Sequence, residues 1–190
     1  MILLSILIPT LPKRLHQLRA LVADLERQLI VADIFHKVEI LFDPTPPPVS
    51  TGVKRNNLLQ RACGKYTWFV DDDDEIVDGA LHAVYIACSS GCDVIEIDGY
   101  MTTNGKSRVD WEIRLGHEYI ATEKFGKPFY LRFPNHITPM LRSCALAASF
   151  PDKTVFEDYE WACKIRDLGV LKTAARVSGF TYHYKHISNK

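Results

Sequence analysis

The sequence predicts an α/β fold that begins with parallel strands and adds antiparallel strands later in the chain. Three observations predict it: a strand–helix–strand pattern in residues 2–42, a third apolar strand at 66–70, and an Asn104-Gly105 turn between two strand-like segments. A strand–helix–strand unit requires a parallel pair joined by a right-handed crossover. Asn-Gly between two strands is a strong signal for an antiparallel hairpin. The expected result is a mixed central sheet flanked by helices.

The opening unit follows from hydrophobic periodicity. Residues 2–8 are almost continuously apolar and end at Pro9-Thr10, which is typical of a strand buried on both faces. Leucines then recur at helical spacing over residues 15–29, with charged residues between them, and predict an amphipathic helix. Residues 38–42 form the second apolar strand.

A proline-rich loop at residues 44–48 comes next, because proline cannot continue a strand. Residues 53–63 are predicted to form a helix that Gly64 ends. The third strand, at 66–70, runs directly into a row of aspartates, and Asp78 is predicted to cap the helix after them.

The second half of the chain is predicted to contain the hairpin, two helices and two closing strands. They are expected at residues 94–103 and 107–115 for the hairpin, 142–149 and 157–168 for the helices, and 171–175 and 179–184 for the strands. Gly169 is expected to end the second helix. Because no repeat and no long linker divides this pattern, residues 1–190 are predicted to form one domain.

Composition excludes several classes of protein. The 190 residues carry 23 basic and 23 acidic side chains, so bulk attraction to nucleic acid or to an acidic membrane is not expected. A hydrophobic share of 47% excludes a disordered chain, and no apolar run approaches the ~20 residues of a transmembrane helix. The five irregularly spaced cysteines favour reduced thiols and a cytoplasmic location. The oligomeric state is not indicated.

Four consecutive aspartates, Asp71 to Asp74, follow the third strand. Ligands of an open α/β sheet bind at the carboxyl ends of its parallel strands, and adjacent carboxylates in a crevice require a compensating cation. In an extended segment Asp71 and Asp73 would point to one side, where they could hold Mg²⁺ or Mn²⁺. The alternative is an exposed acidic turn, which the dipole of the following helix favours.

A second acidic pair, Glu157-Asp158, opens a predicted helix. Thr154 and Glu157 have the capping-box spacing, which explains the glutamate as part of a helix start. Capping does not explain Asp158, and a carboxylate fixed in a first helical turn can act as a general base toward a hydroxyl group. The sequence leaves both interpretations open.

Histidine and basic side chains supply two further candidates. His183 or His186 could complete a metal site, although such histidines are more often surface or core residues. Lys54-Arg55 follow Gly52 at a predicted helix start, where they could contact the base or phosphates of a nucleotide. The alternative for this basic pair is a solvated helix face.

Four blocks of the sequence resemble small single-domain members of glycosyltransferase family 2, which have the GT-A fold. The blocks are residues 5–10 (SILIPT), 52–59 (GVKRNNLL) with 62–74 (ACGKYTWFVDDDD), 156–161 (FEDYEW) and 183–188 (HYKHIS). The second block, which ends in the Asp-x-Asp motif of the family, is the most specific. The resemblance implies a Rossmann-like half that binds a nucleotide sugar, residues 1–103, and an acceptor-side half, residues 104–190.

The resemblance also implies ligands and roles. A UDP-sugar is the expected donor, Mn²⁺ or Mg²⁺ the cofactor, and a carbohydrate or another hydroxyl compound the acceptor. Asp158 matches the catalytic base of inverting members, with Glu157 beside it in the same motif. The implied donor contacts are Pro9, Thr10, Asp43, Lys54, Arg55, Asp71 and Asp72, and the implied metal ligands are Asp71, Asp73, Asp74 and one of His183 and His186. The acceptor candidates are Trp111, Arg114, His117, Arg132 and His136.

The expected reaction is metal-dependent transfer of a sugar from a nucleoside diphosphate to an acceptor hydroxyl, with inversion. Two alternatives remain: an inactive module on the same fold that binds a nucleotide sugar or a glycan, and a nucleotidyltransferase. A nucleotidyltransferase would be expected to carry a glycine-rich phosphate loop after the first strand, and residues 9–14 contain no glycine.

Overall fold

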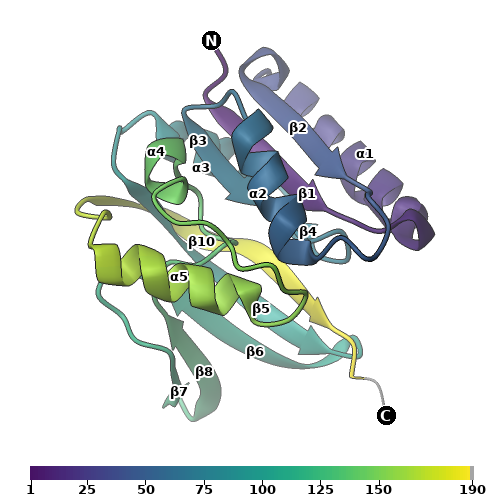
Figure 1. Ribbon diagram of the computed structural model, residues 1–190. Helices are drawn as coiled ribbons and strands as arrows, with labels where there is room; N and C mark the ends of the chain where they lie inside the picture. Colours follow the sequence, from purple (N-terminus) through teal and green to yellow (C-terminus); the bar gives the residue numbers. More distant parts are fainter. Residues whose placement is uncertain (189–190) are drawn as a thin grey trace.

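The chain folds into one mixed sheet with helices on both of its faces (Figure 1). The computed structural model describes residues 1–188; residues 189 and 190, which end the predicted acceptor-side half, lie outside the described residues. The strands are β1 (Leu4–Pro9), β2 (Val38–Asp43), β3 (Tyr66–Phe69), β4 (Glu75–Ile76), β5 (Val94–Thr103), β6 (Lys106–Ile113), β7 (Ile120–Lys124), β8 (Lys127–Arg132), β9 (Met140–Leu141) and β10 (Ala174–His186). The helices are α1 (Leu15–Val31), α2 (Thr51–Arg61), α3 (Ala80–Cys88), α4 (Arg142–Ala145) and α5 (Glu157–Leu168), with short 3-10 turns η1 (Pro12–Arg14) and η2 (Phe35–Lys37).

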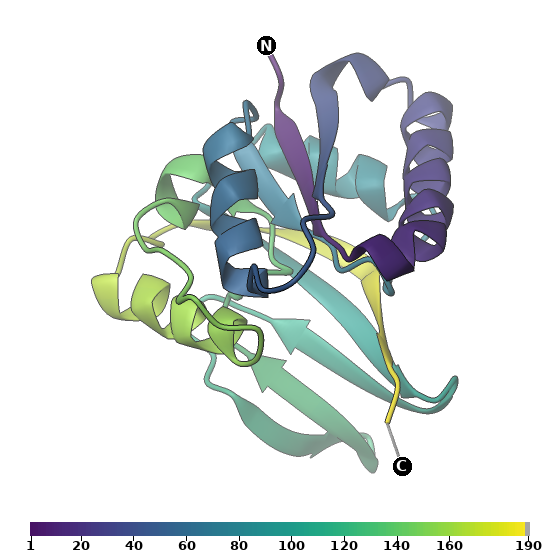
Figure 2. The same ribbon diagram turned by 45° about the vertical axis from the view of Figure 1, so that its right-hand side comes forward.

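The sheet has the strand order β2-β1-β3-β9-β5-β6-β8-β7. The opening strands β2, β1 and β3 are parallel, as the strand–helix–strand pattern predicts. β9 pairs antiparallel with β3 and begins the second part of the sheet. β9 and β6 share one edge of β5, while β10 runs parallel along its other edge and also pairs with β4 (Figure 2). The predicted fold class, α/β with a parallel half and added antiparallel strands, is confirmed.

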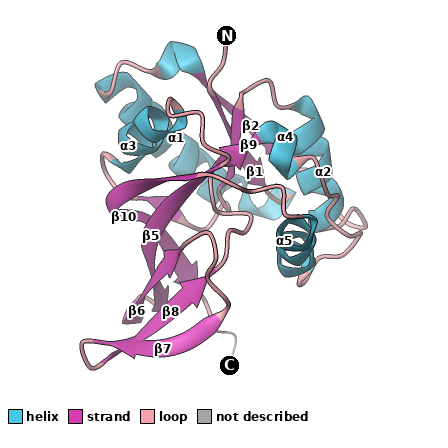
Figure 3. Cartoon of the chain, turned by 90° about the vertical axis from the view of Figure 1, so that its left-hand side faces the viewer, coloured by secondary structure: helices cyan, strands magenta, loops and turns pink. Residues whose placement is uncertain are grey.

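Helices α1 and α3 cover one face of the sheet, and α2, α4 and α5 cover the other (Figure 3). The side chains of β1 alternate between the two cores that result. Ile6 and Ile8 belong to the core that includes the leucines of α1, and Leu7 belongs to the core that includes Leu58 and Trp161. Because β1 is buried on both faces, its sequence is apolar at every position except Ser5.

Gly64 does not end α2, as the sequence predicted, because that helix already ends at Arg61. The glycine lies beside β1, where its N–H donates to Ser5 Oγ at 2.8 Å. A Cβ atom at Gly64 would lie 2.6 Å from the backbone nitrogen of Ser5. The glycine is therefore required by the close approach of the chain to β1.

The Asn104-Gly105 turn joins antiparallel β5 and β6 as predicted. Both turn residues have positive φ, 51° and 70°, which is the conformation that a two-residue hairpin turn needs. The hairpin of β7 and β8 was not predicted, because every residue of β7 is exposed and no apolar pattern marks it. This hairpin extends the sheet away from the helices (Figure 3).

The predicted start of α3 is wrong. Gly79 takes the N-cap position with a φ of 78°. The carboxylate of Asp78 instead forms an ion pair with Arg27 of α1. Asp78 thus ties α1 to the start of α3 and does not cap the helix.

Helix α5 begins at Glu157 and ends at Leu168, with Gly169 as its C-cap, as predicted. Its N-cap residue, however, is Phe156 with a φ of 63°, and within residues 1–188 no side chain caps this helix. The predicted capping box of Thr154 and Glu157 is therefore wrong. Glu157 lies beside Arg55 of α2, which draws its carboxylate away from the helix start.

Two other predicted elements differ in length. The helix expected at 142–149 is only the four residues of α4, because the side chain of Asn56 hydrogen-bonds both backbone groups of Phe150 and draws the chain toward α2. The strands expected at 171–175 and 179–184 are one strand, β10, with register shifts between Arg176 and Tyr182.

The helices are short. The longest, α1, has 17 residues. Across residues 1–188 no helix is both long and apolar enough to cross a membrane. The five cysteines, all in the described part of the chain, are free thiols.

Candidate functional site

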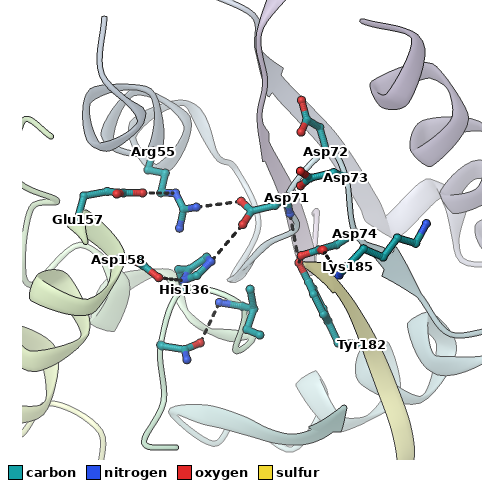
Figure 4. A network of polar contacts seen from close by, with 12 residues as sticks. Arg55, Asp71, Asp72, Asp73, Asp74, His136, Glu157, Asp158, Tyr182 and Lys185 are labelled. Atoms are coloured by element: carbon teal, nitrogen blue, oxygen red, sulfur yellow. Dashed lines mark hydrogen bonds and ion pairs between the residues drawn. The ribbon is translucent and has the colours of Figure 1, made fainter. Parts of the chain in front are cut away.

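An open cavity of about 1680 Å³ lies where β1 and β3 end. It is lined by Pro9-Thr10 at the end of β1, the aspartates after β3, the loop around His136, the start of α5 and the end of β10. The carboxyl ends of parallel strands are the usual ligand-binding edge of an open α/β sheet. Both acidic motifs of the sequence therefore face one cavity (Figure 4).

The four aspartates form a turn and not an extended segment. The backbone N–H of Asp74 donates to the carbonyl oxygen of Asp71 at 3.1 Å. The predicted alternation, with Asp71 and Asp73 on one side, is therefore wrong. The carboxylates of Asp72 and Asp73 lie close together, while those of Asp71 and Asp74 point elsewhere (Figure 4).

Asp72 and Asp73 share one cation, Arg14, at the end of η1. Arg14 Nη1 lies 2.9 Å from Asp72 Oδ1 and 3.0 Å from Asp73 Oδ2. Thr10 Oγ1 also donates to the buried carboxylate of Asp72, at 2.5 Å. Burial raises the pKa of Asp73 above its usual value, although Arg14 acts in the opposite direction. Sequence reasoning missed Arg14, since it lies 58 residues from Asp72 and only the fold brings the two together.

Asp74 faces away from the other aspartates and is held by β10. It accepts a hydrogen bond from Tyr182 Oη at 2.7 Å and one from the backbone N–H of Lys185 at 2.8 Å. Burial, with the charge of Asp71, raises the pKa of Asp74 well above its usual value. These contacts favour a structural role for Asp74 over the predicted role as a metal ligand.

Arg55 joins the two acidic motifs from α2. Its Nη2 lies 2.8 Å from Asp71 Oδ1, and its Nε lies 3.6 Å from Glu157 Oε1. The guanidinium is buried and lies over the rings of Phe69 and Phe150. Burial alone would raise the pKa of Asp71, but Arg55 and a contact with a histidine outweigh it and lower that pKa to about 2. Burial does raise the pKa of Glu157.

The histidine beside Asp71 is His136, in the loop between β8 and β9. Its Nε2 lies 3.5 Å from Asp71 Oδ2, and its Nδ1 lies 3.2 Å from Asp158 Oδ2 (Figure 4). Burial and Arg55 act to lower the pKa of His136, yet the two carboxylates outweigh them and raise it. In turn, His136 and Arg55 overcome the effect of burial and hold the pKa of Asp158 well below its usual value. The sequence indicated His136 only as an acceptor contact.

Of the predicted donor contacts, some line the cavity and Asp43 does not. Pro9, Thr10 and Lys54 line the cavity, and Lys54 Nζ donates to the carbonyl oxygen of Thr10 at 2.6 Å. Burial lowers the pKa of Lys54. Asp43 is buried, and its carboxylate accepts a hydrogen bond at 3.0 Å from the backbone N–H of Thr45. Burial alone would raise the pKa of Asp43, but the hydrogen bonds from Thr45 lower it.

Of the two candidate metal-binding histidines, His183 is engaged with other side chains. Its Nε2 lies 2.9 Å from Thr102 Oγ1, its Nδ1 lies 3.0 Å from Glu75 Oε2, and the ring stacks on Tyr100. His183 therefore lines the same cavity as the aspartates, but its ring nitrogens contact Thr102 and Glu75 and not an aspartate carboxylate. His186 is exposed at the edge of the cavity.

The predicted acceptor contacts also separate. Arg114 is buried and forms ion pairs with the carboxylates of Asp98, Glu96 and Glu112, so it holds β5 and β6 together. Trp111 lies against Gly99, where a Cβ atom would be 2.1 Å from the indole. Arg132 and His117 are both half-buried. Arg132 lines the cavity and lies over the rings of Tyr119 and Tyr130, and His117 follows β6.

The aspartate turn does not form a metal site from protein groups alone. Over residues 1–188 no group of three or more His, Cys, Asp or Glu side chains is arranged to hold a metal ion. The oxygen donors nevertheless fit Mg²⁺ or Mn²⁺, because Mg²⁺ is commonly bound by one or two carboxylates together with phosphate oxygens of a substrate. Asp73 is the best placed, since it faces the cavity and remains partly exposed.

The strand order, the two helical layers and the cavity at the strand ends define a GT-A-like glycosyltransferase fold. The chain is similar to structures of S. aureus TarS, a glycosyltransferase. The complex of TarS 1–349 with UDP matches with a TM-score of 0.65 and 14% identity over 97% of this chain and 60% of that chain. The UDP-GlcNAc complex gives 0.65 and 14% over 100% and 60%, and a further TarS structure gives 0.59 and 16% over 97% and 37%.

Identities this low show the shared fold alone. This chain spans 60% of the TarS 1–349 chain that it matches. No protein-family model and no curated protein matches the sequence.

Proposed function

We propose that this chain is a family 2 glycosyltransferase that transfers a hexose from a UDP-sugar to an acceptor hydroxyl, with inversion. The observation that carries the proposal is that Asp71 and Asp158, one from each acidic motif, lie on either side of His136 in one cavity. TarS structures with the same fold bind UDP and UDP-GlcNAc, which supports a nucleotide-sugar donor. The chain is proposed to act as one cytoplasmic domain, with residues 1–103 toward the donor and 104–190 toward the acceptor.

The diphosphate of the donor is proposed to lie between Thr10 and the aspartate turn. Arg14 is partly exposed there and offers guanidinium N–H groups that suit phosphate oxygens. Lys54 donates to the carbonyl oxygen of Thr10 and so fixes the backbone at the end of β1, next to the proposed donor subsite. Asp43 is proposed to act in the same way, because it is buried and bonded to Thr45.

Metal dependence is part of the proposal. Asp73 would hold Mn²⁺ or Mg²⁺ together with the diphosphate oxygens. When bound, the ion would neutralise charge that develops on the departing diphosphate. Asp73 would have to exchange Arg14 for the ion, because that guanidinium now lies 3.0 Å from its carboxylate.

Asp158 is proposed as the general base. Its carboxylate is partly exposed to the cavity, and its lowered pKa keeps it ionised at neutral pH. It would take the proton of the acceptor hydroxyl while that oxygen forms a bond to the anomeric carbon. The bond between this carbon and the phosphate oxygen breaks, and its electron pair leaves with the diphosphate. Glu157, buried beside Arg55, is proposed to fix Arg55 and not to touch the acceptor.

Activity of two variants tests this function. With a panel of nucleotide sugars and hydroxyl acceptors, release of nucleoside diphosphate is measured for the wild type, Asp158→Asn and Asp73→Asn. We expect Asp158→Asn to lower kcat by about 10²- to 10⁴-fold, because the proton acceptor is lost. Asp73→Asn should mainly weaken the response to Mn²⁺.

Asp167→Asn is the matched control, because Asp167 is an exposed residue near the other end of the same helix. It should keep wild-type turnover. Full activity of both Asp158→Asn and Asp73→Asn with a genuine donor and acceptor would contradict the proposed mechanism.

The second candidate is a module that binds a nucleotide sugar without transferring it. One observation favours it: the contact with His136 and the low pKa make Asp158 a weak base in the absence of ligands. Nucleotide binding without release of sugar from any donor, to water or to an acceptor, would support the module over the enzyme.

A further inference from the structure

His136 lies where the proposed donor and acceptor sides meet. Its ring bridges Asp71 Oδ2, at 3.5 Å from Nε2, and Asp158 Oδ2, at 3.2 Å from Nδ1. The side chain is only 10% exposed. One imidazole therefore spans the gap between the aspartate turn and the first turn of α5 (Figure 4).

The loop that carries His136 is fixed by hydrogen bonds on both sides of the ring. Asn135 Oδ1 accepts from the N–H of Ile137 at 3.2 Å, which closes a turn around the histidine. Asn135 Nδ2 donates to Tyr119 Oη at 2.7 Å, and the carbonyl oxygen of Ile137 accepts from Trp68 Nε1 at 2.8 Å. The backbone cannot shift without breaking these contacts, so the position of the ring is set by the sheet.

A direct contact between His136 and the acceptor does not fit this environment. Each ring nitrogen already faces a carboxylate of the protein, and only 10% of the side chain is exposed. Asp158, by contrast, has a side chain that is 36% exposed. Both side chains line the cavity, but Asp158 presents more of its surface to it than His136 does.

We infer that His136 is a positioning residue that holds the Asp158 carboxylate in one orientation relative to Asp71. The inference rests on the proposed function. Nδ1 lies 3.2 Å from Oδ2 of Asp158, and Oδ1 then remains for the proton of the acceptor hydroxyl. At its other end the ring meets Asp71, which Arg55 holds at 2.8 Å. The distance between the donor subsite and the base is thereby kept constant.

Three substitutions separate the roles of the two ring nitrogens. His136→Ala removes both contacts. His136→Asn places an amide nitrogen near the position of Nδ1 and can still donate to Asp158, whereas His136→Gln reaches the position of Nε2 and can donate only toward Asp71. The comparison of the asparagine and glutamine variants therefore tests the contact with Asp158 alone.

Steady-state kinetics is the main measurement. We expect kcat to fall by about tenfold to a hundredfold in the alanine and glutamine variants, because a misplaced catalytic group costs that much. The asparagine variant should stay within about threefold of the wild type, and KM for donor and acceptor should change little in all three. His82→Ala, at an exposed site on α3, is the control and should match the wild type.

Three results would overturn the inference. They are an unchanged kcat in the alanine variant, an equal loss in the asparagine and glutamine variants, and a raised acceptor KM at constant kcat, which would make His136 an acceptor contact. Thermal melting checks that each variant is folded. If the alanine variant unfolds, the nearly isosteric asparagine and glutamine variants still decide the question.

A readout that needs no activity separates failure of this inference from failure of the proposed function. In protein with ¹⁵N-labelled histidine, the Nδ1 resonance of His136 should shift in Asp158→Asn, and the Nε2 resonance should shift in Asp71→Asn. Absence of the first shift overturns the contact itself. A wild type that transfers no sugar but shows both shifts overturns the proposed function and leaves His136 a structural residue.

Discussion

Tyr182 shows how one side chain shapes the aspartate turn. Its hydroxyl accepts from the N–H of Asp71 at 3.2 Å and donates to Asp74 Oδ2 at 2.7 Å, and its side chain is fully buried. A buried carboxylate that loses such a donor is left with a large desolvation cost. The phenol therefore contributes both to the shape of the turn and to the stability of the fold.

Replacing Tyr182 with phenylalanine should lower the free energy of unfolding by about 2 kcal/mol at about pH 8. Burial and Asp71 raise the pKa of Asp74 well above its usual value, so the folded state binds this proton more tightly than the unfolded state. The stability that comes from Asp74 is then fully present at low pH and is lost as the pH rises through the folded-state pKa. Without the phenol that pKa rises further, so the deficit of the variant should be larger at about pH 8 than at about pH 5.

Urea denaturation at both pH values measures this deficit. Tyr184→Phe is the control, since Tyr184 lies two residues further along β10 and is 38% exposed. An equal deficit at the two pH values would show that the charge of Asp74 is not what the phenol stabilises.

At the scale of elements, α5 places Asp158 without the cap that its sequence suggests. Phe156 holds the N-cap position with a φ of 63° and is 71% exposed. A left-handed conformation costs a residue with a side chain about 1 kcal/mol or more. The start of α5 is thus strained at the residue before the Glu157-Asp158 pair.

Two substitutions at the start of α5 should change the free energy of unfolding in ways that a capping box does not predict. Thr154→Ala should change the free energy of unfolding by less than about 0.5 kcal/mol, whereas loss of a true cap costs about 1 kcal/mol. Phe156→Gly should raise it by about 0.5 kcal/mol, because relief of strain exceeds the added freedom of the unfolded chain. Urea denaturation measures both, and a loss of about 1 kcal/mol in Thr154→Ala would restore the capping box.

The elements that sequence periodicity predicted well are those with one strongly buried pattern. β1 is buried at every position, and the apolar residues of α1 recur at helical spacing, so both were found within a few residues. β7 is exposed throughout, and its pairing with β8 depends on backbone hydrogen bonds that leave no apolar signature. β10 was predicted as two strands, 171–175 and 179–184, whereas one strand continues through residues 176–182 with shifts in register.

The candidate site was predictable in part for a similar reason. The aspartate run and Glu157-Asp158 are local signals, and each occurs next to an element that the sequence predicts. The side chains that connect them are not local: Arg14 reaches Asp72 across 58 positions, and Tyr182 reaches Asp74 across 108. Only the strand order β2-β1-β3-β9-β5 and its pairing with β10 bring such residues together.

At the scale of the whole molecule, charge is balanced in number and concentrated in space. The chain has 23 basic and 23 acidic side chains, yet four aspartates occupy one turn at the cavity. The charge of that turn is partly compensated, because Arg14 forms ion pairs with Asp72 and Asp73, and Arg55 forms one with Asp71. The proposed diphosphate donor would therefore approach a surface where two cations already offset part of the negative charge.

This balance predicts how nucleotide binding depends on Mn²⁺. A ligand at about 100 times its Kd stabilises the fold by about 2.7 kcal/mol, which raises Tm by about 5–10 °C for a chain of this size. UDP with Mn²⁺ should produce this shift at millimolar concentration, and UDP alone less than half of it, because Arg14 compensates only part of the aspartate charge. Arg14→Gln should remove most of the shift with UDP alone and keep most of the shift with UDP and Mn²⁺. Arg19→Gln, at an exposed site on α1, is the control, and equal shifts with and without Mn²⁺ in the wild type would show that donor binding needs no metal.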